Sequence, residues 1–347
     1  MSKSQQIKKQ LMEVLSIYAV GDKIPARTTL CRQLGTNRVV LDQAILAMVG
    51  EGFLASRKGS GTYIARNPHS LRNWGVIVPD VSDPIYAGLV RGVENVAREH
   101  AYNMILCNSD FDIHQQQEYL GRLVQSKVEG LILVPVLHTD IKENLKVFQQ
   151  LEELRVPYVF CNRTIDGIHA PAVVSNDFHG GYLATRHLLA QGYRRIAYVA
   201  PVVYKGSIDR CLGYITALEE AGHVVDRSLI VMDEPNDTPG VAGRLAAMIK
   251  DTEVDAFFCF NDRLAAKILE VAHRVGRPIG VVGYNDSPLC ESNVPKITSV
   301  KYRNVEIGED AAELLVRLLA GEQLGDFRIF MHQPELIVRE SSAHKGV

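Results

Sequence analysis

Six apolar runs in this chain of 347 residues end in acidic, amide or arginine side chains. Carboxylates accept hydrogen bonds, amides both donate and accept them, and arginine offers several donors in one plane. Such a set suits the paired hydrogen bonds that a molecule with many hydroxyl groups requires. The residues are Asp80, Ser82, Asp83 and Tyr86 after "VIVP", Asn108, Ser109 and Asp110 after "MILC", Asn162 and Arg163 after "VFC", Asn176 and Asp177 after "VVS", Asn261 and Asp262 after "FFCF", and Asn285 and Asp286 after "VVGY".

Each of these positions has a structural alternative. An Asp or Asn side chain at a strand-to-helix turn often caps the helix instead of binding a ligand. This alternative is strongest for Asp83, Asp177 and Asp262, which precede predicted helices. The role of each polar residue therefore depends on where the fold places it.

A second kind of chemistry is concentrated near the N-terminus, where basic residues outnumber acidic ones. Residues 1–66 contain ten Lys or Arg and four Asp or Glu, which gives a net charge of +6. The rest of the chain carries −8, because the total is −2. A basic head on an acidic body predicts that the head meets a polyanion, although a solvated basic face would carry the same charge.

The stretch "LASRKGSGTYIARN" in this head allows two interpretations. A Gly-Ser-Gly loop beside basic residues can hold a nucleotide phosphate, or it can form the tip of a β-hairpin that contacts DNA. A phosphate loop of the Walker type continues with Lys-Ser/Thr and a helix, whereas Gly61 is followed here by Thr62 and Tyr63, which favour a strand. We therefore predict a hairpin, with Arg57 and Lys58 placed to contact phosphates.

The residues before this hairpin predict three helices. Apolar residues from Ile7 to Tyr18 follow helical spacing, so a first helix is expected over residues 5–18. The segment "IPARTTLCRQLG" predicts a short second helix, and "TNRVVLDQAILAMVGEG" predicts a third that Thr36 or Asn37 caps. Helices joined by such a tight turn form a helix-turn-helix. With the hairpin as a wing, residues 1–66 are expected to form a winged helix-turn-helix DNA-binding domain.

The head resembles the GntR family of bacterial winged-helix regulators. The resemblance rests on "PAR" at 25–27, "LG" at 34–35, "NR" at 37–38, "GFL" at 52–54 and "KGSGTY" at 58–63. It implies that Arg27 and Arg38 contact double-stranded operator DNA and that Gly61 approaches the minor groove. The expected DNA-binding residues are Arg27, Thr28, Thr36, Asn37, Arg38, Arg57, Lys58, Gly59, Ser60 and Gly61.

Two positions of the third predicted helix depart from the pattern of this family. Val40 and Asp42 stand where the family usually has Thr and Arg. An acid near DNA repels phosphate, so we expect a lower affinity or a changed set of contacts. A GntR-like fold that no longer binds DNA is the alternative.

From Trp74 onward the pattern changes to nine short apolar runs that alternate with amphipathic segments. Apolar strands separated by helices predict parallel sheets covered on both faces. Nine strands with their helices are more than a single hydrophobic core usually holds, so we expect a two-lobed α/β domain over residues 74–340. A polar linker is expected before it, at residues 67–73. Lobe 1 is expected over residues 74–163 and 290–321, and lobe 2 over residues 164–289 and 322–340.

Several blocks of this body resemble the effector domain of the LacI/GalR family, which is related to periplasmic sugar-binding proteins. They include "VIVPDVSDPIYAGLV", "FNDRLAAKIL" and "IGVVGYNDSPL". The resemblance implies a periplasmic-binding-protein-like α/β fold and a homodimer formed through this domain. A GntR-type head on such a body resembles the arabinose repressors of Gram-positive bacteria. The ligand-binding residues that it implies are Asp80, Tyr86, Asn162, Arg163, Arg210, Asn261 and Asn285.

The body also departs from the LacI/GalR pattern at its expected ligand site. Asn162 and Asn285 stand where the family commonly has aspartate, which changes acceptors into mixed donors and acceptors. An aromatic residue for stacking on a sugar is not evident around "DEPNDTPG". We therefore expect a different pattern of recognised hydroxyl groups, and the body alone does not identify the sugar.

The remaining features argue against other classes of protein. The strand-to-helix turns of the body lack G-x-G-x-x-G, and no His forms a plausible nucleophile pair, so an enzyme is not expected. The six cysteines have neither metal-site nor disulfide spacing, and no cofactor is indicated. Without a signal peptide or an apolar run of 18 residues, the protein is expected in the cytoplasm, away from membranes.

These observations predict a transcriptional repressor that is controlled by a small molecule. A small polar ligand, expected to be a sugar, would bind between the two lobes and alter the affinity of a dimer for operator DNA. Paired heads read two half-sites, so a small change in their spacing would alter affinity strongly. A solute-binding protein without DNA-binding activity is the alternative, and the basic winged head argues against it.

Overall fold

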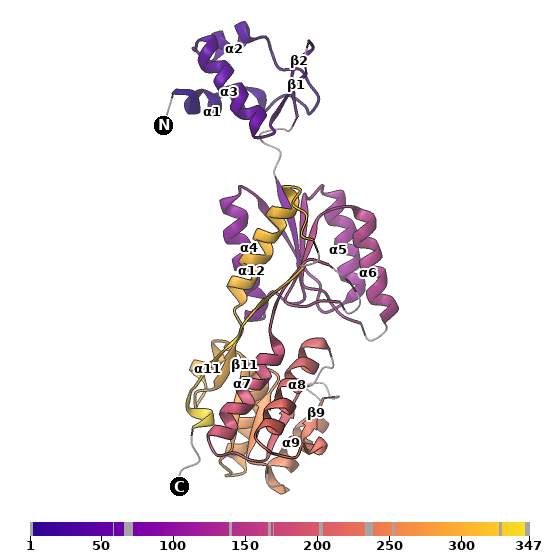
Figure 1. Ribbon diagram of the computed structural model, residues 1–347, viewed down its shortest axis with the longest axis vertical. Helices are drawn as coiled ribbons and strands as arrows, with labels where there is room; N and C mark the ends of the chain where they lie inside the picture. Colours follow the sequence, from indigo (N-terminus) through magenta and orange to yellow (C-terminus); the bar gives the residue numbers. More distant parts are fainter. Residues whose placement is uncertain are drawn as a thin grey trace. The chain divides into compact units, whose positions relative to one another are not determined.

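The computed structural model describes residues 3–57, 59–65, 72–138, 141–165, 168, 170–200, 204–232, 239–251, 254–325 and 328–343. The chain divides into two compact units, Met1–Arg72 and Asn73–Val347 (Figure 1). Most of the linker expected at 67–73 lies outside the described residues. We describe each unit by itself.

The first unit is a winged helix-turn-helix. It contains the helices α1 (Lys3–Leu15), α2 (Arg27–Gln33) and α3 (Arg38–Gly50), followed by the antiparallel strands β1 (Leu54–Arg57) and β2 (Gly61–Ile64). Buried leucines and a methionine from all three helices form its core. The fold predicted for the head is therefore confirmed, although α1 ends three residues before the expected Tyr18, where Ser16 turns its N–H and hydroxyl back to the Glu13 carbonyl.

The second unit begins with a parallel sheet in the order β13-β7-β6-β5-β3-β4. Alternate strand residues pack in opposite directions: Trp74 and Val76 contact the α4 and α12 layer, and Ile77 contacts the α5 and α6 layer. This alternation explains why the strands are apolar throughout. The elements are β3 (Asn73–Val78), α4 (Pro84–Glu99), β4 (Asn103–Asn108), α5 (Ile113–Gln125), β5 (Gly130–Leu133), α6 (Ile141–Leu154), β6 (Tyr158–Cys161), β7 (Ala172–Ser175), α12 (Asn304–Leu319) and β13 (Ile329–His332).

A second sheet in the same unit has the order β14-β12-β11-β10-β8-β9, and only β14 runs antiparallel to its neighbour. The helices α7 and α8 cover one face of this sheet, and α9 and α10 cover the other. The elements are α7 (Asp177–Ala190), β8 (Ile196–Val199), α8 (Lys205–Glu220), η1 (Arg227–Leu229), β9 (Ile230–Val231), α9 (Pro239–Asp251), β10 (Ala256–Cys259), α10 (Asp262–Arg274), β11 (Gly280–Asn285), α11 (Leu289–Ser292), β12 (Thr298–Lys301), β14 (Glu335–Ile337) and η2 (Glu340–Ser342).

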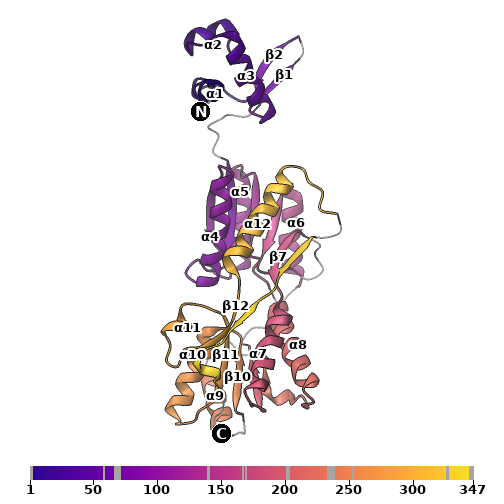
Figure 2. The ribbon, with the colours of Figure 1, turned by 60° about the vertical axis from the view of Figure 1, so that its left-hand side comes forward.

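The chain passes between the two sheets three times: after β7, after β12 and after β13. Figure 2 shows the last of these passages, in which the segment that contains β13 and β14 runs from the first sheet to the second. Two passages are tied together, because Asn176 donates its backbone N–H to the His332 carbonyl at 2.8 Å and its side-chain amide to Gln333 at 3.1 Å.

The sheets divide the second unit differently from the expected lobe boundaries. Residues 164–289 were assigned to lobe 2, but β7 lies in the first sheet, where Asn162 donates its N–H to the Val173 carbonyl at 2.9 Å. Likewise, β12 belongs to the second sheet and β13 to the first, the reverse of the expected assignment. Short apolar strands fit either sheet equally well, so their composition alone does not fix the passage points.

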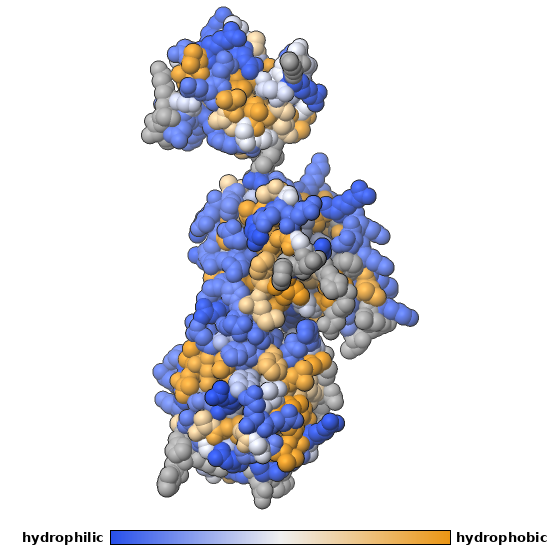
Figure 3. Space-filling view, viewed as in Figure 1, coloured by the Kyte–Doolittle hydropathy of each residue, from blue (hydrophilic) through white to orange (hydrophobic). Residues whose placement is uncertain are grey.

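The two-lobed α/β architecture itself is confirmed. Hydrophilic residues predominate over α4 and α12 on the face shown in Figure 3, which fits helices that bury one side against the sheet. None of the helices in the described part of the chain combines the length and the apolar character needed to cross a lipid bilayer.

Candidate functional site

A cavity of about 520 Å³ lies between the two lobes of the second unit. Apart from β14, the strands of both sheets run parallel, so the loops at their carboxyl ends meet at this place. The cavity brings together all seven residues expected to contact a ligand: Asp80, Tyr86, Asn162, Arg163, Arg210, Asn261 and Asn285. Their assembly at one place is a finding about position, and their role toward a ligand remains a prediction.

Arg210 of α8 forms a buried ion pair in the second lobe, in the lining of the cavity. Its Nε lies 2.8 Å from Oδ1 of Asp177, and its Nη1 donates to the Phe260 carbonyl at 2.7 Å. The guanidinium carbon lies 3.5 Å from the centroid of the Tyr284 ring, whose hydroxyl also donates to Asp177. Burial lowers the pKa of Arg210, but the Asp177 carboxylate offsets this and raises the pKa well above its usual range. Arg210 thus holds two places against α8: the start of α7, through Asp177, and the end of β10, through the Phe260 carbonyl.

The helix caps lie one residue earlier than expected at two places. Asn176 caps α7 by accepting the His179 N–H, and Asn261 caps α10 by accepting the Leu264 N–H. The alternative role of Asp177 as a helix cap is therefore not observed, because its carboxylate holds Arg210 instead. Asn261 uses its amide oxygen as a cap, which leaves its amide nitrogen for the cavity. Only Asp83 caps as expected, by accepting the Ile85 N–H at 3.0 Å.

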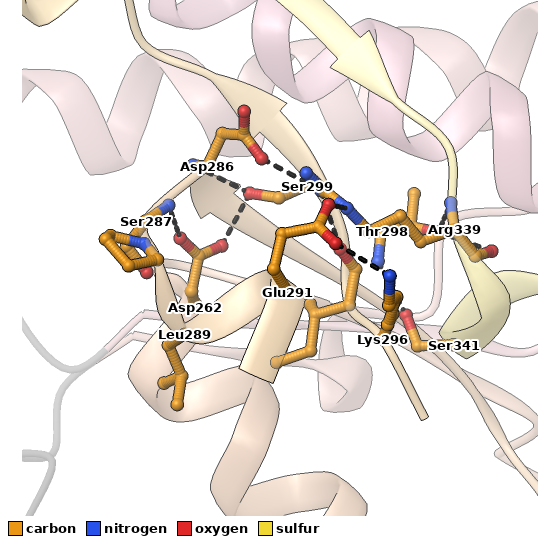
Figure 4. Close-up of polar contacts among 12 residues, drawn as sticks. Asp262, Asp286, Ser287, Leu289, Glu291, Lys296, Thr298, Ser299, Arg339 and Ser341 are labelled. Atoms are coloured by element: carbon orange, nitrogen blue, oxygen red, sulfur yellow. Dashed lines mark hydrogen bonds and ion pairs between the residues drawn. The ribbon is translucent and has the colours of Figure 1, made fainter. Parts of the chain in front are cut away.

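Asp262 is also not a helix cap but the buried anchor of the loop after β11. Figure 4 shows its carboxylate between Ser299 and Ser287, which donate to it at 2.5 and 2.7 Å. Burial raises the pKa of Asp262. Arg339 adds a second tie to the same loop, since it pairs with Asp286 at 2.8 Å. These contacts fix the position of Asn285, which immediately precedes the loop.

Asn162, directly after β6, and Asn285, the last residue of β11, have positive φ values of 70° and 102°, in the left-handed region of backbone conformation. Asparagine tolerates this region better than most residues do, because its short side chain can hydrogen-bond locally. The amide oxygen of Asn285 is buried, and no donor reaches it from the described residues. A buried acceptor without a partner costs free energy, so a donor from a bound molecule would be stabilising there.

Aromatic side chains surround Arg163 on the lobe 1 side of the cavity. Arg163 donates from Nη2 to the Tyr86 hydroxyl at 2.6 Å, and its guanidinium lies 5.0 Å from the Tyr204 ring and 6.0 Å from the Phe111 ring. Burial raises the pKa of Tyr86 to about 12, although Arg163 opposes this, so the phenol is uncharged at neutral pH.

Sequence analysis missed these aromatic residues of the cavity. Phe111, Tyr204 and Phe260 all line it, from three separate segments of the chain. The segment "DEPNDTPG", around which a stacking residue was sought, consists mostly of residues 233–238, which lie outside the described residues. The only signal for Phe111 was its position directly after the polar residues that end "MILCNSD".

Charged residues at the rim complete the cavity. Asp80 accepts the Ser82 hydroxyl and N–H at 2.7 and 2.9 Å, and these hydrogen bonds lower the pKa of its carboxyl. Arg263 of α10 lies 4.0 Å from the carboxylate of Asp83. Aspartates of lobe 1 thus meet an arginine of lobe 2 across the cavity.

In the head, Arg27 and Arg38 are brought together by Asp42. Asp42 accepts from Nε of Arg27 at 3.1 Å and lies 3.7 Å from Nε of Arg38. Arg27 also donates to the Thr62 hydroxyl at 3.2 Å, so it connects the recognition helix α3 with strand β2. The expectation that Asp42 acts mainly as a repulsive charge overlooked these two arginines.

The other expected DNA-binding residues of the helices divide between exposed and inward positions. Asn37 caps α3 by accepting the Val40 N–H at 2.9 Å, while Thr28 and Arg38 are exposed. The Thr36 hydroxyl is buried and has no partner among the described residues, so it does not lie on the exposed face.

The wing has the geometry that its glycines allow. Gly59 and Gly61 have φ of 77° and 126°, and Arg57 pairs opposite Gly61 in the hairpin. Arg57 stacks on the Tyr63 ring at 4.8 Å, and the Tyr63 hydroxyl contacts the Ser60 hydroxyl at 2.5 Å. Lys58 lies outside the described residues. The described tip is thus a compact basic hairpin.

Comparison with known families assigns both units. The family "Bacterial regulatory proteins, gntR family" matches residues 3–64, and the "Periplasmic binding protein-like domain" matches residues 185–342. The chain is 29% identical over 347 residues to the arabinose metabolism transcriptional repressor of Geobacillus stearothermophilus, which covers 95% of each chain. It is 30% identical over 275 residues to the HTH-type transcriptional regulator RegA of Clostridium saccharobutylicum, covering 77% of this chain and 81% of that one. The chain belongs to the same family of HTH-type transcriptional regulators as RegA.

This regulator also resembles solved structures of the family. The transcription regulator CcpA of Lactococcus lactis matches with a TM-score of 0.70 and 25% identity, over 78% of this chain and 99% of that one. A complex of the transcriptional regulator CelR with cellobiose matches with a TM-score of 0.69 and 26% identity, over 92% of this chain and 100% of that one. The expected combination of a GntR-type head with a LacI/GalR-type body is confirmed.

Proposed function

We propose that this DNA-binding regulator represses transcription and that a sugar bound between its lobes releases it from operator DNA. The observation that carries the proposal is the cavity, which collects hydrogen-bonding side chains from both lobes at the carboxyl ends of their strands. The relatives named above are a repressor of arabinose metabolism and a regulator solved with cellobiose. A ligand that contacts both lobes favours their closed arrangement by its differential affinity for that state.

We propose Arg27, Thr28, Thr36, Asn37, Arg38, Arg57, Lys58, Gly59, Ser60 and Gly61 as the DNA-contacting set. Arg38 supports this proposal most strongly, because its side chain is 78% exposed at the first position of α3. The first turn of a recognition helix is the part that enters the major groove. Thr36 fits least well, since its hydroxyl is buried and its N–H donates to the Cys31 carbonyl.

We propose Asp80, Tyr86, Asn162, Arg163, Arg210, Asn261 and Asn285 as ligand contacts. The buried amide oxygen of Asn285 supports this assignment, as it lacks a donor among the described residues. Arg210 is expected to act mainly through Asp177, because its Nε and one Nη are already used. The aromatic rings of Phe111 and Tyr204 provide apolar faces against which a sugar ring can pack.

We propose that the regulator is a homodimer joined through residues 74–340. The edge strand β4 supports this, because among the described strands it pairs with β3 alone, so one row of its backbone groups has no strand partner there. Leu106 on this strand and Val81 beside its end are exposed apolar residues. Two heads held by such a dimer would read two half-sites. We further propose that the protein has no enzymatic activity and acts in the cytoplasm, as its relatives are named regulators.

The proposal is tested by DNA binding of the full chain to a pool of genomic fragments at two salt concentrations, with and without a panel of sugars. We expect binding that weakens steeply with salt, and a sugar that releases the bound fragments. Arg38→Ala should weaken binding and reduce the salt slope by about 0.9 if the lost contact is to a phosphate. Arg274→Ala, which changes an exposed arginine on α10, is the matched control.

Three results would contradict parts of the proposal. If no fragment binds at low salt, the protein is a solute-binding protein. If fragments bind but no sugar changes the affinity, the ligand-controlled part is wrong. If a sugar tightens binding, the regulator uses a co-repressor and the proposed direction is reversed.

A further inference from the structure

Among the described residues, two of the three arginines that line the cavity pair with carboxylates, and Arg163 does not. Arg210 pairs with Asp177 at 2.8 Å, and Arg263 lies 4.0 Å from Asp83 at the rim, near Asp80. Arg163 has no carboxylate within 4.0 Å among the described residues. The cavity therefore contains one positive charge that the protein does not neutralise by a direct ion pair.

The described groups in contact with the Arg163 guanidinium are uncharged. Its only hydrogen-bond acceptor in the described part of the chain is the Tyr86 hydroxyl, and its Nε is buried without a partner. The adjoining Asn162 carries an amide, and Tyr86, Tyr204 and Phe111 surround the guanidinium with their rings. Ring faces attract a cation, but much less strongly than a carboxylate does.

An arginine in this setting can bind an anion from outside the protein. A guanidinium has five N–H donors in a fixed fork, and only one is used here by Tyr86. Carboxylates and phosphates accept two of these donors at once, which adds geometric specificity to charge attraction. Closure of the lobes would remove water from Arg163, and an unpaired charge in such a site is costly. A ligand that brings a negative charge offsets this cost.

We propose that the effector is an acidic sugar, a polyhydroxylated molecule whose carboxylate or phosphate binds Arg163. This proposal rests on the proposed function, in which the cavity binds the effector. The cavity of about 520 Å³ is of the size that holds small ligands. Arg163 also borders an adjoining space of about 200 Å³, where Asp177 is paired with Arg210 and Asp209 with Lys205.

The experiment compares acidic sugars with their neutral parents by calorimetric titration of the full-length protein. The carboxylate arm uses D-galacturonate against D-galactose, and the phosphate arm uses D-glucose 6-phosphate against D-glucose. We expect at least one acid to bind more tightly than its parent by a factor of ten or more, on the order expected for a charge-assisted pair. The arm that shows the preference identifies the carboxylate or the phosphate as the source.

Arg163→Gln removes the charge and keeps most of the side-chain length. This variant should weaken binding of the acid by at least about 30-fold, as for truncation of one partner of a buried charge pair, and should weaken binding of a neutral sugar by a clearly smaller factor. Arg163→Lys keeps the charge but loses the forked donors. Its affinity for the acid should lie between the affinities of the natural protein and of Arg163→Gln. Arg274→Gln on the exposed face of α10 is the control, and thermal melting of each variant checks that it folds.

The proposal is overturned if neutral sugars bind the natural protein as tightly as the acids. It is also overturned if Arg163→Gln weakens neutral and acidic sugars equally, because Arg163 would then only shape the cavity. In both cases a sugar still binds, so the proposed function survives. If the protein binds DNA but no sugar of either class, the ligand-controlled function and this inference fail together.

Discussion

The arginines of the head and those of the cavity occupy opposite environments. The Arg38 side chain is 78% exposed in the head, whereas the Arg210 side chain is 4% exposed in the body. An exposed cation is screened by salt and attracts any polyanion, which suits a surface that meets DNA. A buried cation interacts strongly with a few fixed neighbours, which suits the recognition of one small molecule. In the proposed function, arginine thus serves affinity for DNA in one region and selectivity for a ligand in the other.

The largest expected effect comes from breaking the buried pair. Arg210→Met leaves the Asp177 carboxylate, whose side chain is 12% exposed, without its cation. We expect the free energy of unfolding of the body to fall by about 3–5 kcal/mol, measured by chemical denaturation. Arg274→Met on the exposed face of α10 should change it by less than about 0.5 kcal/mol.

Asp177→Asn in the Arg210→Met background removes the carboxylate that this substitution strands. The double variant should recover part of the lost stability, because an uncharged amide is less costly to bury than a carboxylate. No recovery would mean that Arg210 acts through packing on Tyr284 and not through its charge.

A smaller effect is expected from the exposed arginine of the head. Arg38→Ala should lower affinity for a bound genomic fragment by about tenfold at low salt, which corresponds to one lost contact of 1–3 kcal/mol. The unfolding free energy should stay nearly constant, because this side chain is largely solvated. A loss of stability equal to that of the Arg210 variant would remove the contrast between the two regions.

Asp42 distinguishes two interpretations of the recognition helix. If Asp42 only repels DNA, then Asp42→Asn should tighten binding to all fragments. If it orients Arg27 and Arg38, as their distances of 3.1 and 3.7 Å indicate, then the variant should weaken specific binding by up to about fivefold, since an exposed pair contributes at most about 1 kcal/mol. Fluorescence anisotropy with a specific and a random fragment separates the two outcomes.

The smallest effect concerns pH and the buried Asp262. Its pKa in the folded protein is raised by burial, so the folded state keeps this proton at pH values where the unfolded chain has lost it. The contribution of Asp262 to stability is therefore complete at low pH and declines as pH rises from the usual value near 3.8 through the raised pKa. Asp262→Asn should lack this decline when unfolding is measured from pH 3 to 7. Parallel pH profiles of the two proteins would contradict the assignment.

Sequence patterns predicted the elements whose signals are local. All nine apolar runs of the body form strands, from β3 to β11, and the helices and wing of the head were expected from caps, spacing and glycines. The strands β12, β13 and β14 were not expected, because they are short and mix polar with apolar residues. The choice of sheet for each strand depends on pairing between distant segments, which composition does not encode.

The candidate site was predicted in position but not in its contacts. Polar residues at the strand ends indicated the cavity, since parallel strands bring those ends together. Asp177 was expected as a cap, and only the arrangement of α7 beside α8 shows that it meets Arg210. Phe111 and Tyr204 were missed, because an aromatic residue after a strand has no spacing that distinguishes a cavity from a core.

The central claim is that the cavity and the DNA-binding surface are coupled, and one reciprocal titration tests it most directly. Affinity of the full chain for a bound fragment is measured with and without a saturating sugar, and affinity for that sugar with and without the fragment. Coupled sites must change each other's affinity by the same factor. We expect the sugar to lower affinity for DNA and the DNA to lower affinity for the sugar equally. Unchanged DNA affinity at saturating sugar would contradict the account.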